Sequence, residues 1–419
     1  DKTLHMQGPE GVWPFAVGAV ASQAPVLVVT ATGRQAQDLA EMLKAMVGDS
    51  VELFPAWETL PHERLSPGVE TVATRMRVLR RLRTGLGGDA KSGRTQPPSE
   101  LKIVVASARA VLQPVQQNLG NIEPIRLAEG QEITFDELPE RLVELGYTHV
   151  DVVAKRGHFA IRGGIVDIFP ASEELPVRVD FWGDEVSEVR AFSVGDQRTI
   201  PNLEPGTVTV YPCRELLLTD EVREKAAALA QEHAGNAELA ELFDKISQKI
   251  AVQGMEALIP ALRTSELVTL PELMPEGTHT IVTTPAAVKR RAVDLAETGK
   301  QFMEAGWEVA AMGGSMPLDG VAYLSLAGLQ QVQVKLGRPW WTMSPVGVAD
   351  YGEADSTDNA GGAVLDDDVL TLDYAPAPTP RGDMEAIGAV MSDIRNRVES
   401  GGRVAFAAPT PAVAARMVR

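Results

Sequence analysis

The side chains of residues 177–182 alternate between apolar and polar types. Such alternation is typical of a strand that has one face against a core and the other toward solvent. The apolar set then belongs to the core, and the opposite face carries Arg178, Asp180 and Trp182. Arginine and tryptophan dominate the binding energy of protein–protein interfaces, and an exposed indole is costly unless something covers it. One interpretation of this strand is therefore a surface that binds another protein.

A second arginine, Arg162, is also expected to point away from the core, because it lies opposite Phe159 and Ile161 in a regular strand. The alternative is a tryptophan folded over strand aliphatics, with the arginines paired to Asp180 or Glu185. On the residues alone, both interpretations remain open.

Phosphate chemistry requires a pattern that this chain lacks. A phosphate-binding loop reads Gly-x-x-x-x-Gly-Lys-Ser/Thr, because the lysine neutralises phosphate charge and the hydroxyl ligates magnesium. The candidate helix-opening glycines are Gly8 and Gly11, and the second is followed by a valine and a tryptophan. The only Gly-Lys pair, Gly299-Lys300, has no glycine five residues before it. We therefore expect no bound nucleotide or other cofactor.

Hydrolytic and metal chemistry are not indicated either. The 6 histidines are scattered, without metal-ligand spacing or a neighbouring serine elbow. The acidic pair Asp184-Glu185 follows a glycine and is interpreted as part of a turn. We expect no catalytic residue and no metal site.

Composition bounds the class of protein. A chain of 419 residues should form two to four domains, and 44% hydrophobic with 23% charged residues fits a globular chain. A net charge of -18 opposes binding to a phosphate backbone, except through a local basic patch. The single cysteine excludes an internal disulfide and favours a reducing, cytoplasmic setting, and no apolar run is long enough for a membrane span.

Residues 1–125 alternate between helix and strand patterns. The runs at 25–31 and 101–106 are short, apolar and rich in β-branched residues, as in parallel strands buried on both faces. The Gly-, Pro- and Ser-containing stretch 84–100 is interpreted as a surface loop. The fold class is therefore α/β.

Over residues 126–213 the sequence pattern predicts mainly strands separated by turns, which is typical of a small β-rich (α+β) domain. The α/β pattern resumes over 214–347, so insertion of one domain into another is the economical interpretation. Residues 348–380 are acidic and contain prolines, which predicts an exposed linker. Residues 381–419 predict the start of a further α/β domain.

A predicted helix at 71–83 is unusually basic. It has an apolar stripe at helical spacing and carries Arg75, Arg77, Arg80, Arg81 and Arg83. Contact with DNA or docking against an acidic surface are possible roles, and a solvated face is the favoured interpretation.

Three stretches resemble one family. Residues 54–61 (FPAWETLP), 156–170 (RGHFAIRGGIVDIFP) and 177–185 (VRVDFWGDE) are similar in order and spacing to elements of bacterial transcription-repair coupling factors (Mfd). The last two are also similar, less closely, to the excision-repair protein UvrB.

The resemblance implies a helicase-like domain of degenerate P-loop type, split by an inserted domain that docks on UvrA. The UvrA contacts it implies are Arg162, Arg178 and Trp182. It also implies that RNA polymerase binding and ATP- and magnesium-dependent translocation on double-stranded DNA belong to parts of the longer protein absent here. This chain is then not an enzyme and links stalled RNA polymerase to nucleotide excision repair through UvrA.

Two alternatives stay open. One is a divergent NTP-dependent helicase domain. The other is a DNA-binding domain of the UvrB type, which would require the tyrosine-rich hairpin that UvrB-type proteins use for stacking. Residues 66–83 contain no tyrosine, which argues against that clamp.

Overall fold

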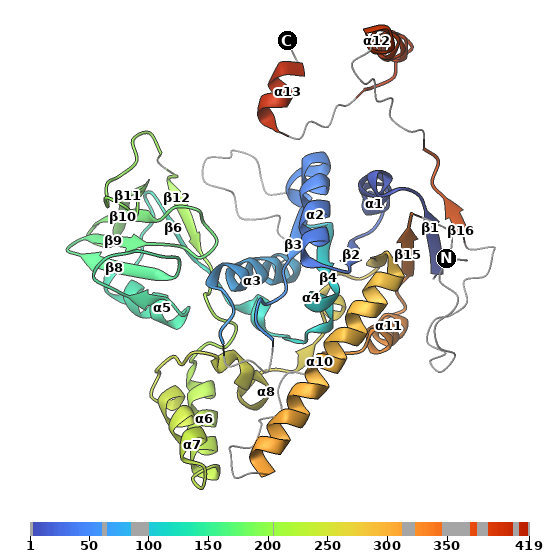
Figure 1. The fold of residues 1–419 in the computed structure, drawn as a ribbon. Helices are drawn as coiled ribbons and strands as arrows, with labels where there is room; N and C mark the ends of the chain where they lie inside the picture. The colour runs from blue at the N-terminus through green and yellow to red at the C-terminus, as the bar shows by residue number, and fades with distance from the viewer. Residues whose placement is uncertain are drawn as a thin grey trace. The chain divides into compact units, whose positions relative to one another are not determined.

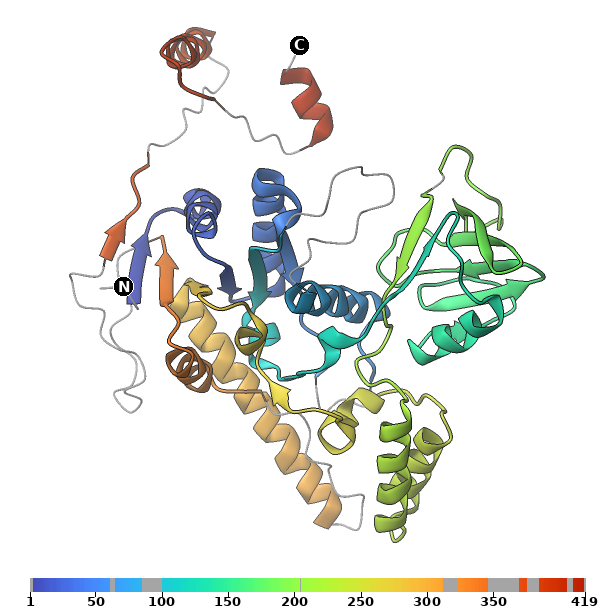
Figure 2. The same ribbon diagram turned by 180° about the vertical axis from the view of Figure 1, so that it is seen from behind.

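The structure is a computed structural model, and Figures 1 and 2 show the chain from opposite sides. It divides into two compact units, Asp1–Leu372 and Asp373–Arg419, and each is described by itself. The described residues are 3–60, 65–84, 100–203, 205–311, 323–345, 369–374, 384–404 and 410–417.

A seven-stranded sheet organises the first unit (Figure 1). All of its strand pairs are parallel. From one edge to the other the strands are β16 (Val369–Thr371), β1 (Thr3–Gln7), β15 (Trp340–Ser344), β14 (His279–Thr283), β2 (Val26–Thr30), β4 (Ile103–Ser107) and β3 (Val51–Phe54). Every residue of β2 and β4 is buried, so the prediction of parallel strands covered on both faces is confirmed.

Helices cover both faces of this sheet (Figures 1 and 2). On one face, α1 (Trp13–Ala21) and α2 (Gly33–Val47) pack on alternate residues of β2, including Val26 and Val28. On the other, α3 (Val69–Thr84) packs on a larger core that includes Leu27 and Val29. This second face is completed by α4 (Ala108–Leu112), α10 (Pro285–Ala311) and α11 (Leu326–Lys335).

A separate five-stranded sheet forms the β-rich region, as predicted. Its order is β11 (Glu185–Ala191), β10 (Val177–Trp182), β9 (Ile165–Ile168), β8 (His158–Arg162) and β7 (Thr148–His149), antiparallel except for the last pair. Its helix is α5 (Leu138–Glu144), preceded by η4 (Phe135–Glu137). The first and last strands of the region, β6 (Ile125–Ala128) and β12 (Thr207–Val210), are antiparallel neighbours. The chain therefore enters and leaves this region at one place.

Helices follow the β-rich region. They are α6 (Asp220–Glu232), α7 (Ala237–Ser247), η5 (Met255–Leu258), α8 (Ile259–Leu262) and α9 (Leu270–Leu273). The first four share a small core of their own, into which Trp57 from the first part of the chain is packed. A two-stranded pairing of β5 (Val115–Gln116) with β13 (Leu267–Val268) adds a second link between the two parts.

The predicted linker 348–380 differs from the structure at one point. Val369–Thr371 forms strand β16, which pairs in parallel with β1 at the edge of the large sheet. The three residues Val-Leu-Thr are good strand formers, and the free edge of β1 offers them backbone partners. The rest of that range, apart from residues 372–374, and nearly all of the predicted loop 84–100 lie outside the described residues.

The second unit contains α12 (Met384–Glu399) and α13 (Pro411–Met417). Residues 405–409 of the predicted further α/β domain lie outside the described residues. Within the described ranges, no helix combines the length and apolarity needed to cross a membrane. The same residues contain no group of three His, Cys, Asp or Glu side chains placed to hold a metal ion.

Candidate protein-interaction face

The two faces of the five-stranded sheet differ in chemistry. One face is apolar and joins the main core through residues such as Val166, Val177 and Val179. We call the opposite side the outer face, and it carries Arg162, Ile165, Asp167, Arg178, Asp180, Trp182, Glu188 and Arg190. The predicted alternation along 177–182 is therefore confirmed.

Strand register places the three predicted residues on this one face. Arg178 lies opposite Asp167 on β9 and Arg190 on β11. Ile165 of β9 lies two residues before Asp167 on the same face. Arg162 of β8 and Asp180 of β10 lie on either side of Ile165. Trp182 follows two residues further along β10. Since adjacent strands lie about 4.8 Å apart, the structure brings Arg162, Arg178 and Trp182 together on one side of the sheet.

Trp182 is 84% exposed. It stands at the end of β10, just before a turn in which Gly183 takes a left-handed conformation with φ 64°. The next residue, Asp184, accepts a hydrogen bond from the backbone N–H of Phe135 at 2.9 Å. This bond fits the interpretation of the acidic pair as turn chemistry. The indole is thus presented by a fixed turn and is not covered by its own domain.

Arg162 is exposed at the end of β8. Its guanidinium donates to the backbone carbonyl of Asp151 at 2.9 Å, and no carboxylate of the described residues lies within 4.0 Å of it. The following turn requires glycine, because Gly163 has φ 61° and a Cβ on Gly164 would lie 3.1 Å from the carbonyl oxygen of Phe181. The turn aims Arg162 outward, and no ionic partner for it lies within the part of the chain that the structure describes.

Arg178 is held quite differently. Its Nε and Nη2 donate to the two carboxylate oxygens of buried Asp167, at 2.7 and 2.9 Å. Its guanidinium also lies 5.0 Å from the ring centre of Phe192, and its side chain is only 18% exposed. The hydrogen bond to Asp167 raises the pKa of Arg178, against the lowering effect of burial. The suggested pairing with Asp180 or Glu185 was wrong for this arginine, because the neighbouring strand supplies the carboxylate.

A third arginine on the outer face was missed in the sequence. Arg190 of β11 donates to Asp180, and its Nε lies 3.1 Å from a carboxylate oxygen of Glu188. The sequence could have indicated Arg190, because Val189 and Arg190 alternate between apolar and polar as residues 177–182 do.

Part of the outer face is covered by its own chain. A small apolar cluster of Val153, Ala160, Phe169 and Phe192 is buried there, with Val150 and Val194 packed against it. The open part of the face is therefore the end that carries Arg162 and Trp182.

The basic helix α3 is not a solvated face, so that expectation was wrong. Arg75 is fully buried and forms a bidentate contact with the carboxylate of Glu215. Arg77 and Arg81 both pair with Glu52 of β3, at 3.2 and 2.8 Å. These arginines join elements far apart in the sequence.

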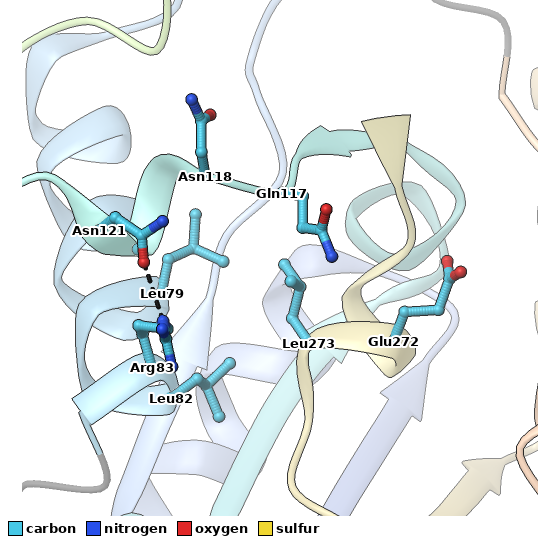
Figure 3. Close-up of a pocket in the computed structure, with 9 residues that line it drawn as sticks. Leu79, Leu82, Arg83, Gln117, Asn118, Asn121, Glu272 and Leu273 are labelled. Carbon is cyan, nitrogen blue, oxygen red and sulfur yellow. Dashed lines mark hydrogen bonds between the residues drawn. The ribbon is translucent and has the colours of Figure 1, made fainter. Parts of the chain in front are cut away.

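The remaining arginines of α3 contact the chain just before the β-rich region. Arg80 lies 3.2 Å from a carboxylate oxygen of Glu123 and donates to the carbonyls of Gly120 and Asn121 at 3.4 Å. Arg83 donates to the side-chain oxygen of Asn121 at 2.8 Å (Figure 3). Arg75 contacts Glu215, which lies just after the β-rich region. Helix α3 therefore contacts both chain segments that connect the β-rich region to the α/β domain.

A pocket of about 400 Å³ lies beside this contact (Figure 3). It is lined by α3, by the residues between β5 and β6, and by α9. Its lining residues are Leu79, Leu82, Arg83, Gln117, Asn118, Gly120, Asn121, Glu272 and Leu273. The pocket therefore belongs to the junction and not to the outer face.

Two side chains in or near the first family-like stretch are held at the same junction. The indole N–H of Trp57 donates to the carboxylate of Glu215 at 2.8 Å. Ser66 donates to Glu256, which also accepts from Arg214 at 2.9 Å. Trp57 and Ser66 therefore connect the first part of the chain to the second.

The connection from β1 to α1 is the place where a phosphate loop would lie. Here the indole N–H of Trp13 donates to the carbonyl of Gly8 at 2.8 Å. A Cβ built on Gly8 would lie 3.0 Å from the side chain of Leu372. An indole and a leucine therefore pack against this turn.

Comparison with known proteins agrees with this architecture. Residues 125–216 match the family described as the UvrB interaction domain. The transcription-repair-coupling factor of Mycobacterium tuberculosis is 42% identical over 428 aligned residues, which cover 99% of this chain and 33% of that protein. The transcription-repair-coupling factor of Bacillus subtilis is 34% identical over 215 residues, covering 50% of this chain and 17% of its own length.

A more distant similarity covers part of the chain. UvrABC system protein B of Streptococcus agalactiae is 32% identical over 130 residues, which are 31% of this chain and 19% of that protein. The chain spans about a third of the length of the mycobacterial relatives. From its UvrB interaction domain and its similarity over nearly its whole length, we conclude that the chain belongs to the family of transcription-repair-coupling factors, where it corresponds to the N-terminal region.

Proposed function

We propose that this chain is the UvrA-recruiting module of a transcription-repair-coupling factor. Its docking site is the outer face, with Arg162, Arg178 and Trp182 as the predicted site residues. The observation that carries the proposal is the 84% exposed indole of Trp182, on the same face as Arg162, which has no carboxylate partner among the described residues. A large uncovered aromatic on one face with an exposed arginine is the composition of an interface centre.

In the longer protein, this module brings excision repair to a site marked by a stalled RNA polymerase. RNA polymerase binding and ATP-driven translocation on double-stranded DNA are assigned to other parts of that protein. The large parallel sheet is proposed to be a helicase-like scaffold without a nucleotide. The reducing, cytoplasmic setting expected from the single cysteine belongs to the same proposal.

Titration calorimetry with purified UvrA tests the docking site. Replacing Trp182 by alanine removes the anchor and should weaken binding by about 2 kcal/mol, roughly 30-fold. Replacing Arg162 by alanine should cost more than about 1 kcal/mol and reduce the dependence of affinity on salt. Neither change should lower the thermal stability of the chain, because both side chains are exposed.

Matched controls lie on the α/β domain. Phe15→Ala removes another exposed aromatic, 63% exposed on α1, and Arg34→Ala removes an arginine side chain that is 90% exposed on α2. Both should bind UvrA like the unaltered chain. Equal affinities for Trp182→Ala, Arg162→Ala and the two controls would refute the site, and no binding by the unaltered chain would refute the function.

The absence of a nucleotide is tested separately. Magnesium-ATP should leave the melting temperature unchanged, because a ligand stabilises a protein only if it binds the folded state. An upward shift of several degrees would favour the helicase alternative.

A further inference from the structure

The guanidinium of Arg178 makes several contacts within its own domain. Two of its nitrogens contact Asp167, and the third, Nη1, donates to the backbone carbonyl of Gln197 at 3.4 Å. Its central carbon lies over the ring of Phe192. Breaking the contact to Asp167 would leave that carboxylate buried without its partner.

The contact to Gln197 reaches a tightly bonded loop, residues 193–198. Gln197 takes a left-handed conformation with φ 61°, and its N–H donates to the carbonyl of Ser193 at 2.9 Å. The N–H of Ser193 in turn donates to the carbonyl of Arg198 at 2.9 Å. Arg178 therefore holds a loop whose own conformation is closed by internal bonds.

This loop holds the segment that positions Arg162. The side-chain amide of Gln197 donates to the carbonyl of Val153 at 3.1 Å, and Val153 is buried in the small cluster on the outer face. Two residues earlier, the exposed Asp151 presents the carbonyl that accepts from Arg162. A continuous chain of contacts thus runs from Asp167 through Arg178, the loop and residues 151–153 to Arg162.

We infer that Asp167 and Arg178 act as positioning residues for the docking face. They hold the 193–198 loop, and through it the segment that orients Arg162. Direct recognition by Arg162 and Trp182 then depends on this ion pair. The partner surface should offer a carboxylate to the first and an apolar pocket to the second. This inference rests on the proposed function.

Three variants interrupt the contacts at different points. Asp167→Asn keeps the shape of the side chain but removes its charge. Arg178→Lys keeps the charge but cannot form the two parallel hydrogen bonds that the guanidinium makes with a carboxylate. Gln197→Gly removes the amide that contacts Val153 and suits the left-handed backbone, so it leaves the buried ion pair intact. Arg190→Lys is the matched control, because the ion pairs of Arg190 are with Asp180 and Glu188, outside the loop.

Affinity for UvrA at two salt concentrations and amide hydrogen exchange distinguish the roles. Each of the three variants should weaken binding by about three- to tenfold, with the salt dependence unchanged. Asp167→Asn combined with Arg178→Lys should be no weaker than the weaker single variant, because the pair acts as a unit. Exchange at Ser193 and Gln197 should be faster in Asp167→Asn and Arg178→Lys, and unchanged in Arg190→Lys.

Two results would overturn the inference. One is Asp167→Asn binding as tightly as the unaltered chain, or more tightly, while Arg178→Lys loses affinity and salt dependence. That result would mean that Arg178 meets UvrA directly. The other is unchanged exchange of the loop in Asp167→Asn and Arg178→Lys. If the unaltered chain does not bind UvrA, the proposed function fails, whereas the exchange measurements still test the coupling of the ion pair to the loop.

Discussion

The arginines of α3 and Arg162 of the outer face look alike in the sequence but have different surroundings. Arg75 and Arg81 of α3 are buried, and each has a buried carboxylate partner. Arg162 is exposed and bonds only to a backbone carbonyl among the described residues. A dense run of arginines therefore marked an internal junction here, while an isolated arginine beside a tryptophan marked the open surface. Burial and pairing distinguish the two roles, and local charge density does not.

The largest loss of stability is expected for a buried arginine of α3. Arg75→Met leaves the charge of Glu215 buried and without its guanidinium partner, and should lower the free energy of unfolding by about 3–5 kcal/mol. Chemical denaturation followed by circular dichroism measures the loss. Arg34→Met, at an exposed position, should change stability by less than about 0.5 kcal/mol.

A second substitution checks the cause. If the unpaired charge is responsible, adding Glu215→Gln to Arg75→Met should recover part of the loss, because the neutral amide still accepts from the indole of Trp57. Equal or greater instability of the double variant would contradict this account.

Glu52 provides a pH-dependent test of the same helix. Burial raises the pKa of Glu52, but Arg77, Lys44 and Arg81 together outweigh it, so the pKa falls below its usual 4.5. A carboxyl whose folded-state pKa is lowered contributes stability that is complete above pH 4.5 and is lost as the pH falls through the lower, folded-state value.

Glu52→Gln should therefore be less stable than the unaltered chain by about 1–3 kcal/mol at pH 7, and the difference should shrink below pH 4.5. Denaturation curves at several pH values between neutral and about pH 3 measure it. A difference that grows as the pH falls would show that the sign of the pKa shift is wrong.

The smallest expected effect comes from the exposed end of α3. Arg83→Ala removes one hydrogen bond to Asn121 and should change stability by less than about 0.5 kcal/mol, with UvrA affinity unaltered. The same denaturation and titration measurements apply. A loss of stability above about 1 kcal/mol would contradict the conclusion that the buried arginines of α3 stabilise the fold and the exposed one does not.

Much of the fold could be predicted because the decisive signals are local. The apolar runs that form β2 and β4 indicated strands buried on both faces, and the alternation in β10 indicated which side chains leave the core. The alternation placed Trp182 on the outer face but left open whether its indole was covered, and the structure shows it 84% exposed. Each of these depends on a few consecutive residues.

The features that were missed depend on pairing between distant segments. Arg75 and Glu215 are separated by 140 residues, and no local pattern indicates that they meet. Arg178 and Asp167 are 11 residues apart, and their contact depends on the register of β9 against β10. Strand β16 has only three residues and follows an acidic run, so its place in the sheet depends on the open edge of β1.

The anchoring of the β-rich region on α3 has a consequence for how such proteins are assembled. The arginines of the helix contact Gly120, Asn121, Glu123 and Glu215, which all lie outside residues 125–213. From within that region, Arg156 pairs with Glu70 of the helix at 3.4 Å. Ile125 and Val210 lie opposite each other, so a short turn could bridge the gap left if the region were removed. The contacts of these arginines with both connecting segments would therefore remain if the region were replaced by another domain.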